Sequence, residues 1–169
     1  MSIENVRSYF RSLGREGDIR EFSQSSATVE LAAQALGVEP ARIAKTLSFQ
    51  DGEGCLLIVA AGDARIDNPK FKAAFGFKAK MLAPEEALRL TGHAVGGVCP
   101  FAVPDTVRVC LDVSLRRFDT VFPACGIVEN IPAYAAAVDI DVRLRSPLLQ
   151  PSGEPRRVPS RLGYVYLKP

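Results

Sequence analysis

The sequence predicts a single α/β domain built around a mixed, curved β-sheet. The chain has 169 residues, of which 47% are apolar, so it has the length of one domain and enough apolar residues to build a core. Helix-type and strand-type patterns of apolar residues interleave along the chain without the strict strand–helix–strand order of an all-parallel sheet. No internal repeat is visible.

The first part of the chain contains two helix signals with a short strand between them. Ser2 can cap a helix whose apolar residues recur at helical spacing, and Gly14 ends that pattern. Hydroxyl-bearing residues up to Thr28 precede a second helix that ends at Gly37, and Pro40 opens one short helical turn. The expected elements are a helix over 3–13, a strand over 20–22, a helix over 28–36 and a turn over 40–44.

The middle of the chain contains a hairpin signal. Asp51-Gly52-Glu53-Gly54 joins two strand-like runs, which is typical of a tight hairpin connection. Pro69, preceded by the capping pair Asp67-Asn68, and Pro84 each open a short helix. The expected strands are 45–50, 55–61, 78–82, 107–113, 120–125 and 126–131, and the expected helices are 67–75 and 84–90.

The end of the chain is basic and rich in proline. We expect a short helix over 133–138, no long regular element where proline recurs every fourth residue from Pro147 to Pro159, and an edge strand over 163–167. Residues 141–169 carry a net charge of +4 and residues 1–140 carry −2. We therefore expect a domain over 1–140 and a basic extension over 141–169 that is partly packed on that domain. The extension either contacts nucleic-acid phosphates or is a solvated arm.

Composition excludes several classes of protein. The longest unbroken apolar run, 55–61, is too short to span a membrane, and the first residues lack the pattern of a signal peptide, so we expect a cytoplasmic protein with no membrane partner. The four cysteines fall at irregular intervals and the chain has one histidine, so we expect reduced thiols, no metal and no cofactor. No phosphate-binding, dinucleotide-binding, nucleophile-elbow or zinc-protease motif is present.

Two features suggest a functional site. The segment Gly92–Pro100 contains three glycines and a proline, so it is either an ordinary turn or a loop whose amides can approach a ligand and donate to an oxyanion. Lys45 begins a strand that we expect to be buried, so its ammonium group either points into a cleft toward an anion or reaches water along the sheet edge.

The candidate catalytic side chains each have a structural alternative. His93 can be a general base or a residue that stabilises a turn. Cys99 and Cys125 can be nucleophiles only if a nearby base or helix terminus activates them, and are otherwise inert thiols. Asp112 either faces the site or pairs with an arginine.

Three blocks of the sequence are informative together: Ser25–Val38, Ile43-Ala44-Lys45-Thr46-Leu47 and Gly92–Pro100. They resemble the YbaK/ProX family of aminoacyl-tRNA editing domains. They have the order and spacing of that family, and the resemblance extends over about residues 5–130. It implies a barrel-like sheet flanked by helices and hydrolysis of the ester that joins a wrong amino acid to tRNA.

The resemblance also implies roles for individual residues. Lys45 is similar to the family lysine that engages the terminal adenosine or its phosphate, and Gly96–Pro100 is similar to a loop that binds the aminoacyl group through its amides. Thr46 follows the lysine as in the members that act on cysteinyl-tRNA, and Cys99 stands where many members have serine or threonine. The implied catalytic residues are Lys45, Gly97 and Val98, and the implied substrate-binding residues are Phe22, Thr28, Thr46, His93, Gly96, Cys99, Pro100 and Gly126.

The leading hypothesis is a free-standing deacylase that hydrolyses tRNA carrying cysteine, alanine or serine, with tRNA-Pro as the expected tRNA and a tRNA synthetase as a further candidate partner. An aminoacyl ester is already activated, so positioning and oxyanion stabilisation can supply catalysis without a protein nucleophile. One alternative is a non-catalytic module of the same fold that binds tRNA or a synthetase. Another is a small-molecule hydrolase that uses the Cys99 thiol.

Overall fold

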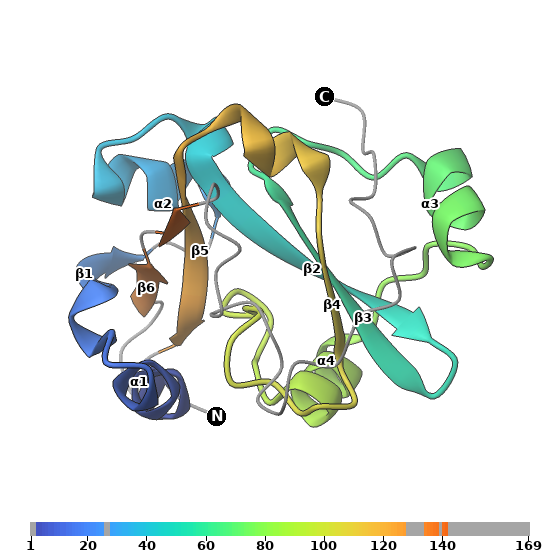
Figure 1. Ribbon diagram of the computed structural model, residues 1–169, viewed down its shortest axis with the longest axis horizontal. Helices are drawn as coiled ribbons and strands as arrows, with labels where there is room; N and C mark the ends of the chain where they lie inside the picture. Colours follow the sequence, from blue (N-terminus) through green and yellow to red (C-terminus); the bar gives the residue numbers. More distant parts are fainter. Residues whose placement is uncertain (1–2, 26–27, 128–133, 139, 142–169) are drawn as a thin grey trace.

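A mixed, curled sheet of seven strands organises the part of the chain that the computed structural model describes, residues 3–25, 28–127, 134–138 and 140–141 (Figure 1). The strand order is β1-β6-β5-β2-β3-β4, with β7 paired to β5. The predicted single α/β domain with a mixed sheet is confirmed. The helices are α1 (Ile3–Ser12), η1 (Glu16–Asp18), α2 (Val29–Leu36), η2 (Pro40–Arg42), α3 (Asn68–Phe75), α4 (Pro84–Thr91) and η3 (Val113–Arg117), and the strands are β1 (Ile19–Ser25), β2 (Ile43–Asp51), β3 (Gly54–Ala61), β4 (Arg108–Leu111), β5 (Thr120–Ile127), β6 (Tyr134–Val138) and β7 (Ile140–Asp141).

Local capping signals place the helices where the sequence predicts them. Thr28 Oγ1 accepts a hydrogen bond from the Leu31 amide at 3.2 Å, which satisfies one of the free amides of the first turn of α2. Gly37 ends α2 in the left-handed conformation, with φ at 67°. Asp67 caps α3 in the same way as Thr28 caps α2, and Gly92 ends α4.

The β2–β3 hairpin lies inside the sheet, between β5 and the edge strand β4. Its register pairs Asp51 with Gly54, and the positive φ of Gly52 lets the chain reverse between them. Every residue from Cys55 to Ala61 is buried, because β3 lies between β2 and β4 and has both faces covered. The predicted hairpin is confirmed.

The predicted helix over 133–138 is wrong, because residues 134–138 form strand β6. The segment is rich in alanine, which favours a helix locally. However, β6 pairs with β1 on one side and β5 on the other, and a five-residue helix is too short to be stable alone. Pairing along both edges therefore outweighs the local preference for a helix.

Three smaller predictions also need correction. The expected strand over 78–82 is reduced to one isolated bridge between Met81 and Phe49. The two strands expected over 120–125 and 126–131 are a single strand, β5, as far as Ile127. The turn expected over 40–44 is shorter, because Ile43 already begins β2. The predicted edge strand over 163–167 and most of the basic extension lie outside the described residues.

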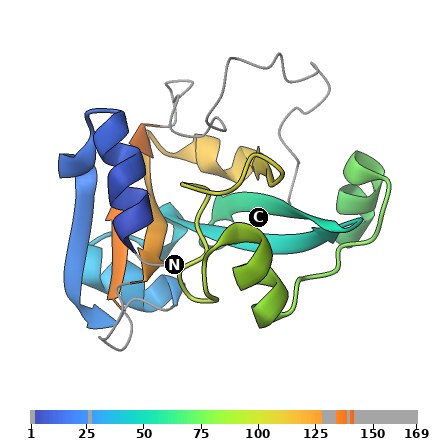
Figure 2. The ribbon, with the colours of Figure 1, turned by 90° about the horizontal axis from the view of Figure 1, so that it is seen from below.

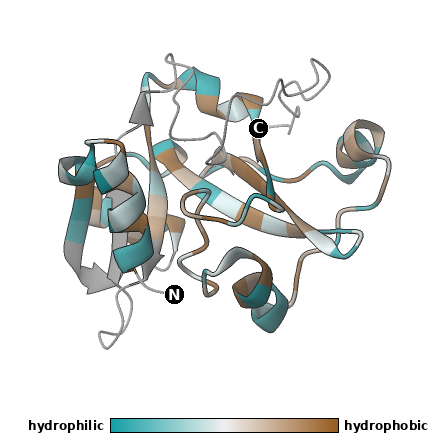
Figure 3. Cartoon of the chain, turned by 60° about the horizontal axis from the view of Figure 1, so that its bottom comes forward, coloured by the Kyte–Doolittle hydropathy of each residue, from teal (hydrophilic) through white to brown (hydrophobic). Residues whose placement is uncertain are grey.

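The helices and the loop after α4 cover the sheet. Figure 2 shows this loop running between α4 and the side of the molecule formed by α1 and β5. The rings of Phe10 in α1 and Phe101 in the loop meet edge to face, 5.0 Å apart, inside the main buried cluster. Both hydrophilic and hydrophobic residues occur along α4 in Figure 3, as in a helix with one face on the core. Among the described residues, no helix has the length and hydrophobicity to cross a membrane.

Candidate functional site

The parallel ladder between β2 and β5 is very short. It consists of the pairs Ile43 with Phe122 and Ala44 with Pro123. Beyond these pairs the two strands separate. Ligands of α/β proteins commonly bind where neighbouring parallel strands separate, so this part of β2 is a candidate site.

A non-strand segment meets the same edge of β2 farther along. The Leu82 amide donates to the Ser48 carbonyl oxygen at 3.0 Å, and the Gln50 amide donates to the Lys80 carbonyl oxygen at 2.8 Å. Between the end of the β5 ladder at Ala44 and the contact at Ser48, residues 45–47 have no backbone partner on this edge among the residues that the structure describes. We call residues 45–47 the open edge of β2.

The turn after β3 holds the ammonium group of Lys45. Lys45 Nζ donates to the carbonyl oxygen of Gly62 at 2.9 Å and to that of Ala64. Partial burial lowers the pKa of the Lys45 ammonium, while the nearby Asp63 carboxylate raises it and the Arg65 guanidinium lowers it further. Lys45 therefore stays close to the sheet, and one of its three N–H groups remains for a ligand.

Sequence reasoning missed the turn that holds Lys45. Asp63, between the two carbonyls, forms an ion pair with Arg117, with Nη1 and Oδ2 at 2.9 Å. Gly62 packs so closely against η2 that a Cβ atom at this position would overlap the carbonyl oxygen of Pro40. The sequence contained one signal for this turn, the glycine directly after a buried strand. Glycine at such a position often marks a close approach of two backbones.

Thr46 points to the opposite face of the sheet from Lys45. In the hairpin register Lys45 lies opposite Ala60 and Thr46 lies opposite Val59, and successive side chains of a strand alternate between faces. Thr46 Oγ1 is buried and has no hydrogen-bond partner in the part of the chain that the structure describes. A buried hydroxyl without a partner is uncommon and costs stability unless a ligand or water completes it.

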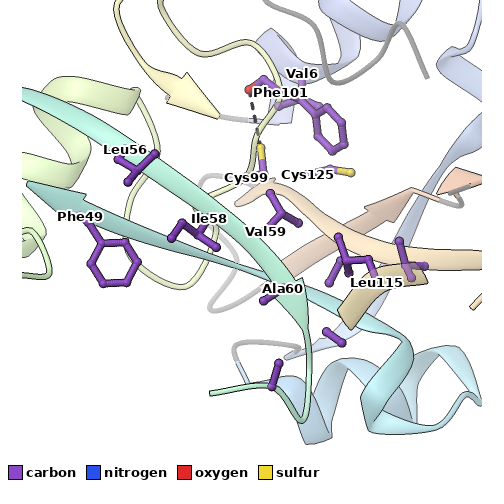
Figure 4. Close-up of a cluster of buried hydrophobic side chains, with 14 of the residues drawn as sticks. Val6, Phe49, Leu56, Ile58, Val59, Ala60, Cys99, Phe101, Leu115 and Cys125 are labelled. Carbon is purple, nitrogen blue, oxygen red and sulfur yellow. Dashed lines mark hydrogen bonds between the residues drawn. The ribbon is translucent and has the colours of Figure 1, made fainter. Parts of the chain in front are cut away.

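The glycine-rich loop lies on the Thr46 face. Val98 packs against a buried cluster that includes Leu57, and Leu57 and Val59 share one face because they are two residues apart in β3. Figure 4 draws Cys99 beside Val59, the residue opposite Thr46 in the hairpin register. Lys45 and the loop therefore border the open edge of β2 from opposite faces.

A tight turn determines which amides of the loop are free. The Gly97 amide donates to the Ala94 carbonyl oxygen at 3.0 Å, and Gly96 adopts a φ of 95°, which glycine tolerates best. Gly97, implied as catalytic by the resemblance, thus already uses its N–H in the turn. The amides of Val98 and Cys99 donate to no group among the described residues, so they are the better candidates for oxyanion donors.

His93 joins the two ends of the loop. Its Nε2 lies 2.8 Å from the carbonyl oxygen of Phe101 and 3.4 Å from Cys99 Sγ, and its amide donates to Thr91 Oγ1 at 3.1 Å. The side chain is only 1% exposed, and burial lowers the pKa of the imidazole. This geometry favours the structural alternative for His93, a neutral side chain that fixes the loop.

The cysteines of the site are not activated. Burial raises the pKa of the Cys99 thiol to about 12 and also raises that of Cys125, which Figure 4 shows beside it. The Cys99 thiol donates to the carbonyl oxygen of Phe101, the bond drawn as a dashed line in Figure 4. Neither sulfur has the depressed pKa of a nucleophile. Among the described residues, no group of three histidine, cysteine or acidic side chains is placed to hold a metal ion.

The remaining residues implied by the resemblance have varied positions. Thr28 is exposed and caps α2, and Pro100 is buried in the loop. Phe22 belongs to β1 and Gly126 to β5, and β6 lies between these two strands. Asp112 is fully buried and caps η3 by accepting from the Ser114 amide at 2.8 Å, so it does not face the open edge as a free carboxylate.

This combination of a curled mixed sheet, a lysine on an open strand edge and a covering glycine loop defines a YbaK-type domain. The chain belongs to the family described as "Aminoacyl-tRNA editing domain", whose profile matches residues 23–130. The resemblance drawn from the three sequence blocks is therefore confirmed.

Relatives and solved structures agree with this assignment. The uncharacterized protein YwhH of Bacillus subtilis is 58% identical over 127 residues, which cover 75% of this chain and 81% of that protein. Proline–tRNA ligase of Thermotoga maritima is 33% identical over 104 residues, which cover 61% of this chain but only 18% of the ligase. A crystal structure of a protein proposed to be a trans-editing enzyme for prolyl-tRNA synthetase has a TM-score of 0.69 and 29% identity, covering 80% of this chain and 85% of that one.

Proposed function

We propose that this protein is a trans-editing deacylase that hydrolyses the ester of tRNA charged with a small wrong amino acid, namely cysteine, alanine or serine on tRNA-Pro. The observation that carries the proposal is the open edge of β2, with the Lys45 ammonium on one face and the glycine loop on the other. Family membership supports the reaction class, and the likeness to prolyl-tRNA synthetases supports the choice of tRNA.

The two faces suggest how the substrate lies. The terminal nucleotide of the tRNA is anionic, so it contacts the free N–H of Lys45. The aminoacyl group is small and partly apolar, so it lies on the other face beside Thr46 and the loop. The ester that joins the two halves then crosses the open edge, where none of the described strands blocks it.

The reaction needs an oxyanion donor and a bound attacking group. A water molecule attacks the ester carbonyl carbon, and the charge that develops on the carbonyl oxygen is stabilised by the amides of Val98 and Cys99. The intermediate then breaks the bond to the ribose oxygen, which takes up the proton lost by the water. The products are a free amino acid and an uncharged tRNA, and no protein side chain acts as nucleophile.

The same proposal includes partners and location. The substrate is an aminoacyl-tRNA, and a tRNA synthetase that releases the wrong product is a candidate second partner. Because charged tRNA is made and used in the cytoplasm, we place the protein there.

A deacylation assay tests the proposal. tRNA-Pro charged with cysteine, alanine, serine or proline is incubated with the wild-type protein, with Lys45→Ala and with the control Lys78→Ala, which removes an exposed lysine after α3. We expect hydrolysis of at least one small aminoacyl ester and a loss of about 100-fold in kcat/KM in Lys45→Ala only, the cost of a charge-assisted hydrogen bond. Tight tRNA binding without hydrolysis would instead support the non-catalytic module.

A further inference from the structure

We infer that the main chain of Thr46 recognises the amino acid itself, by pairing with the α-ammonium group and the ester carbonyl as one strand residue pairs with another. The inference rests on the proposed function, because it concerns the substrate of the same site. The inference requires that the amino acid esterified to the tRNA has a free α-ammonium group. It therefore excludes as substrates those esters in which the α-amino group is acylated or part of a peptide bond.

The hairpin register fixes the direction of the Thr46 backbone groups. Ser48 and Gln50 use their backbone groups on the edge away from β3, where they bond to residues 80–82. Because strand backbone groups alternate between the two edges, Thr46 directs its N–H and C=O to that same edge. The backbone groups of Ala44 point to the same edge, where Ala44 pairs with β5.

Thr46 is therefore the residue whose backbone groups face the open edge. The β5 ladder ends at Pro123, and the next backbone contact on this edge is at Ser48. Within the described ranges, no residue bonds to the Thr46 N–H or C=O on this side. The Oγ1 of the same residue is buried and also lacks a partner. One residue thus offers three polar groups for which the described part of the chain supplies no partner.

These groups fit an aminoacyl ester. In an antiparallel sheet, two facing residues exchange two hydrogen bonds, each donating its N–H to the C=O of the other. An aminoacyl ester carries an ammonium donor and a carbonyl acceptor on either side of one α-carbon, as a strand residue does. The α-ammonium donates to the Thr46 carbonyl oxygen, and the ester carbonyl oxygen accepts from the Thr46 N–H, which adds a third donor to those of Val98 and Cys99.

The pairing also determines where the substrate side chain lies. Facing residues in an antiparallel pair place their side chains on the same face of the sheet. An L-amino acid therefore directs its side chain to the face that holds Thr46 Oγ1 and the glycine loop, where a serine hydroxyl or cysteine thiol can complete the unpartnered hydroxyl. A D-amino acid would direct it to the face that holds Lys45.

Matched substrates test the inference without altering the protein. tRNA-Pro is charged with L-alanine, with N-acetyl-L-alanine and with D-alanine, and kcat/KM is measured for each. We expect acetylation to reduce it by about 10- to 100-fold, which corresponds to the loss of one charged hydrogen bond, and D-alanine to reduce it by at least about 10-fold. Equal rates within twofold for the free and acetylated esters would overturn the inference.

A binding arm separates this inference from the proposed function. The probe is an RNA microhelix that ends in 3′-amino-3′-deoxyadenosine carrying alanine in a stable amide linkage, with and without an N-acetyl group. A Kd lower by about 10-fold or more for the free ammonium form supports the inference even if no ester is hydrolysed, in which case only the deacylase function fails. Equal Kd values overturn it, whether or not hydrolysis is observed.

Thr46→Val provides the protein-side control, because valine keeps the branched shape and the backbone groups and removes only Oγ1. We expect this variant to keep its preference for the free ammonium form. It should lower the ratio of seryl to alanyl ester hydrolysis by about 3- to 10-fold, as expected for one neutral hydrogen bond. An unchanged ratio would overturn the assignment of Oγ1 to the substrate side chain.

Discussion

Gly62→Ala should destabilise the protein strongly, although it adds only one methyl group. The new Cβ atom would overlap the Pro40 carbonyl oxygen and lie 2.7 Å from Val29 Cγ1, so the β3–α3 turn must move away from η2 and α2. Overpacking of this kind typically costs about 1–3 kcal/mol. The displaced Gly62 carbonyl would also weaken its hydrogen bond to Lys45 Nζ, at about 1 kcal/mol.

These contributions together give a loss of about 3 kcal/mol in the free energy of unfolding. For a chain of this size each kcal/mol lowers Tm by roughly 2–4 °C, so we expect a decrease of about 6–12 °C, measured by differential scanning calorimetry. Gly17→Ala is the matched control, because nothing lies within 4 Å of a Cβ at Gly17 and its φ is not in the left-handed region. A Gly62→Ala protein that melts within about 2 °C of this control would refute the close-packing argument.

Three further predictions concern the loop and the tail. Iodoacetamide at pH 8 should modify Cys110, which is partly exposed, and leave the fully buried Cys99 unmodified. Burial raises the pKa of both thiols, that of Cys99 to about 12, so the difference in exposure separates them. The proposed deacylase activity should be unchanged, and mass spectrometry identifies the modified thiol. Burial lowers the pKa of His93 from 6.5, so the unfolded state binds more protons and stability is lost as pH falls below about 6.5. The free energy of unfolding, measured with urea at pH 5.5 and at pH 7.5, should differ less between the two pH values in His93→Asn than in the wild type. An equal difference in the two proteins would mean that other groups cause the pH dependence. Replacing Arg156 and Arg157 with serine should flatten the salt dependence of tRNA binding by roughly one unit of slope per lost phosphate contact, and an unchanged slope would indicate a solvated arm.

Local chemistry explains the part of the fold that was predictable. Thr28 and Asp67 cap their helices through side-chain oxygens only three residues from the amides they bind, and the Gly52 turn fixes the hairpin register within a few residues. Such signals depend on neighbours in the chain and are visible in the sequence. Strand β6 was not predictable in this way, because its alanines become a strand only through pairing with β1 and β5.

The candidate site likewise has one part that the sequence predicted and another part that only the structure revealed. Lys45, Thr46 and the glycine loop could be selected from the sequence. The assignment of donor amides could not be made there, because the turn that closes on Ala94 uses the Gly97 N–H and leaves that of Val98 available. His93 likewise changes from a candidate base to a structural residue only once its contact with Phe101 is known.

By itself, the sequence determined the fold class, the helix caps, the β2–β3 hairpin and the family resemblance, because each depends on residue types at short spacing. Only the tertiary structure decided that Lys45 and the loop approach β2 from opposite faces and that β5 separates from β2 after Ala44. Side-chain alternation assigns neighbouring residues to opposite faces, but which element covers each face depends on packing between segments far apart in the chain. The open edge exists for the same reason. The pairing of β2 with β5 ends at Ala44, and the contact of β2 with residues 80–82 begins only at Ser48.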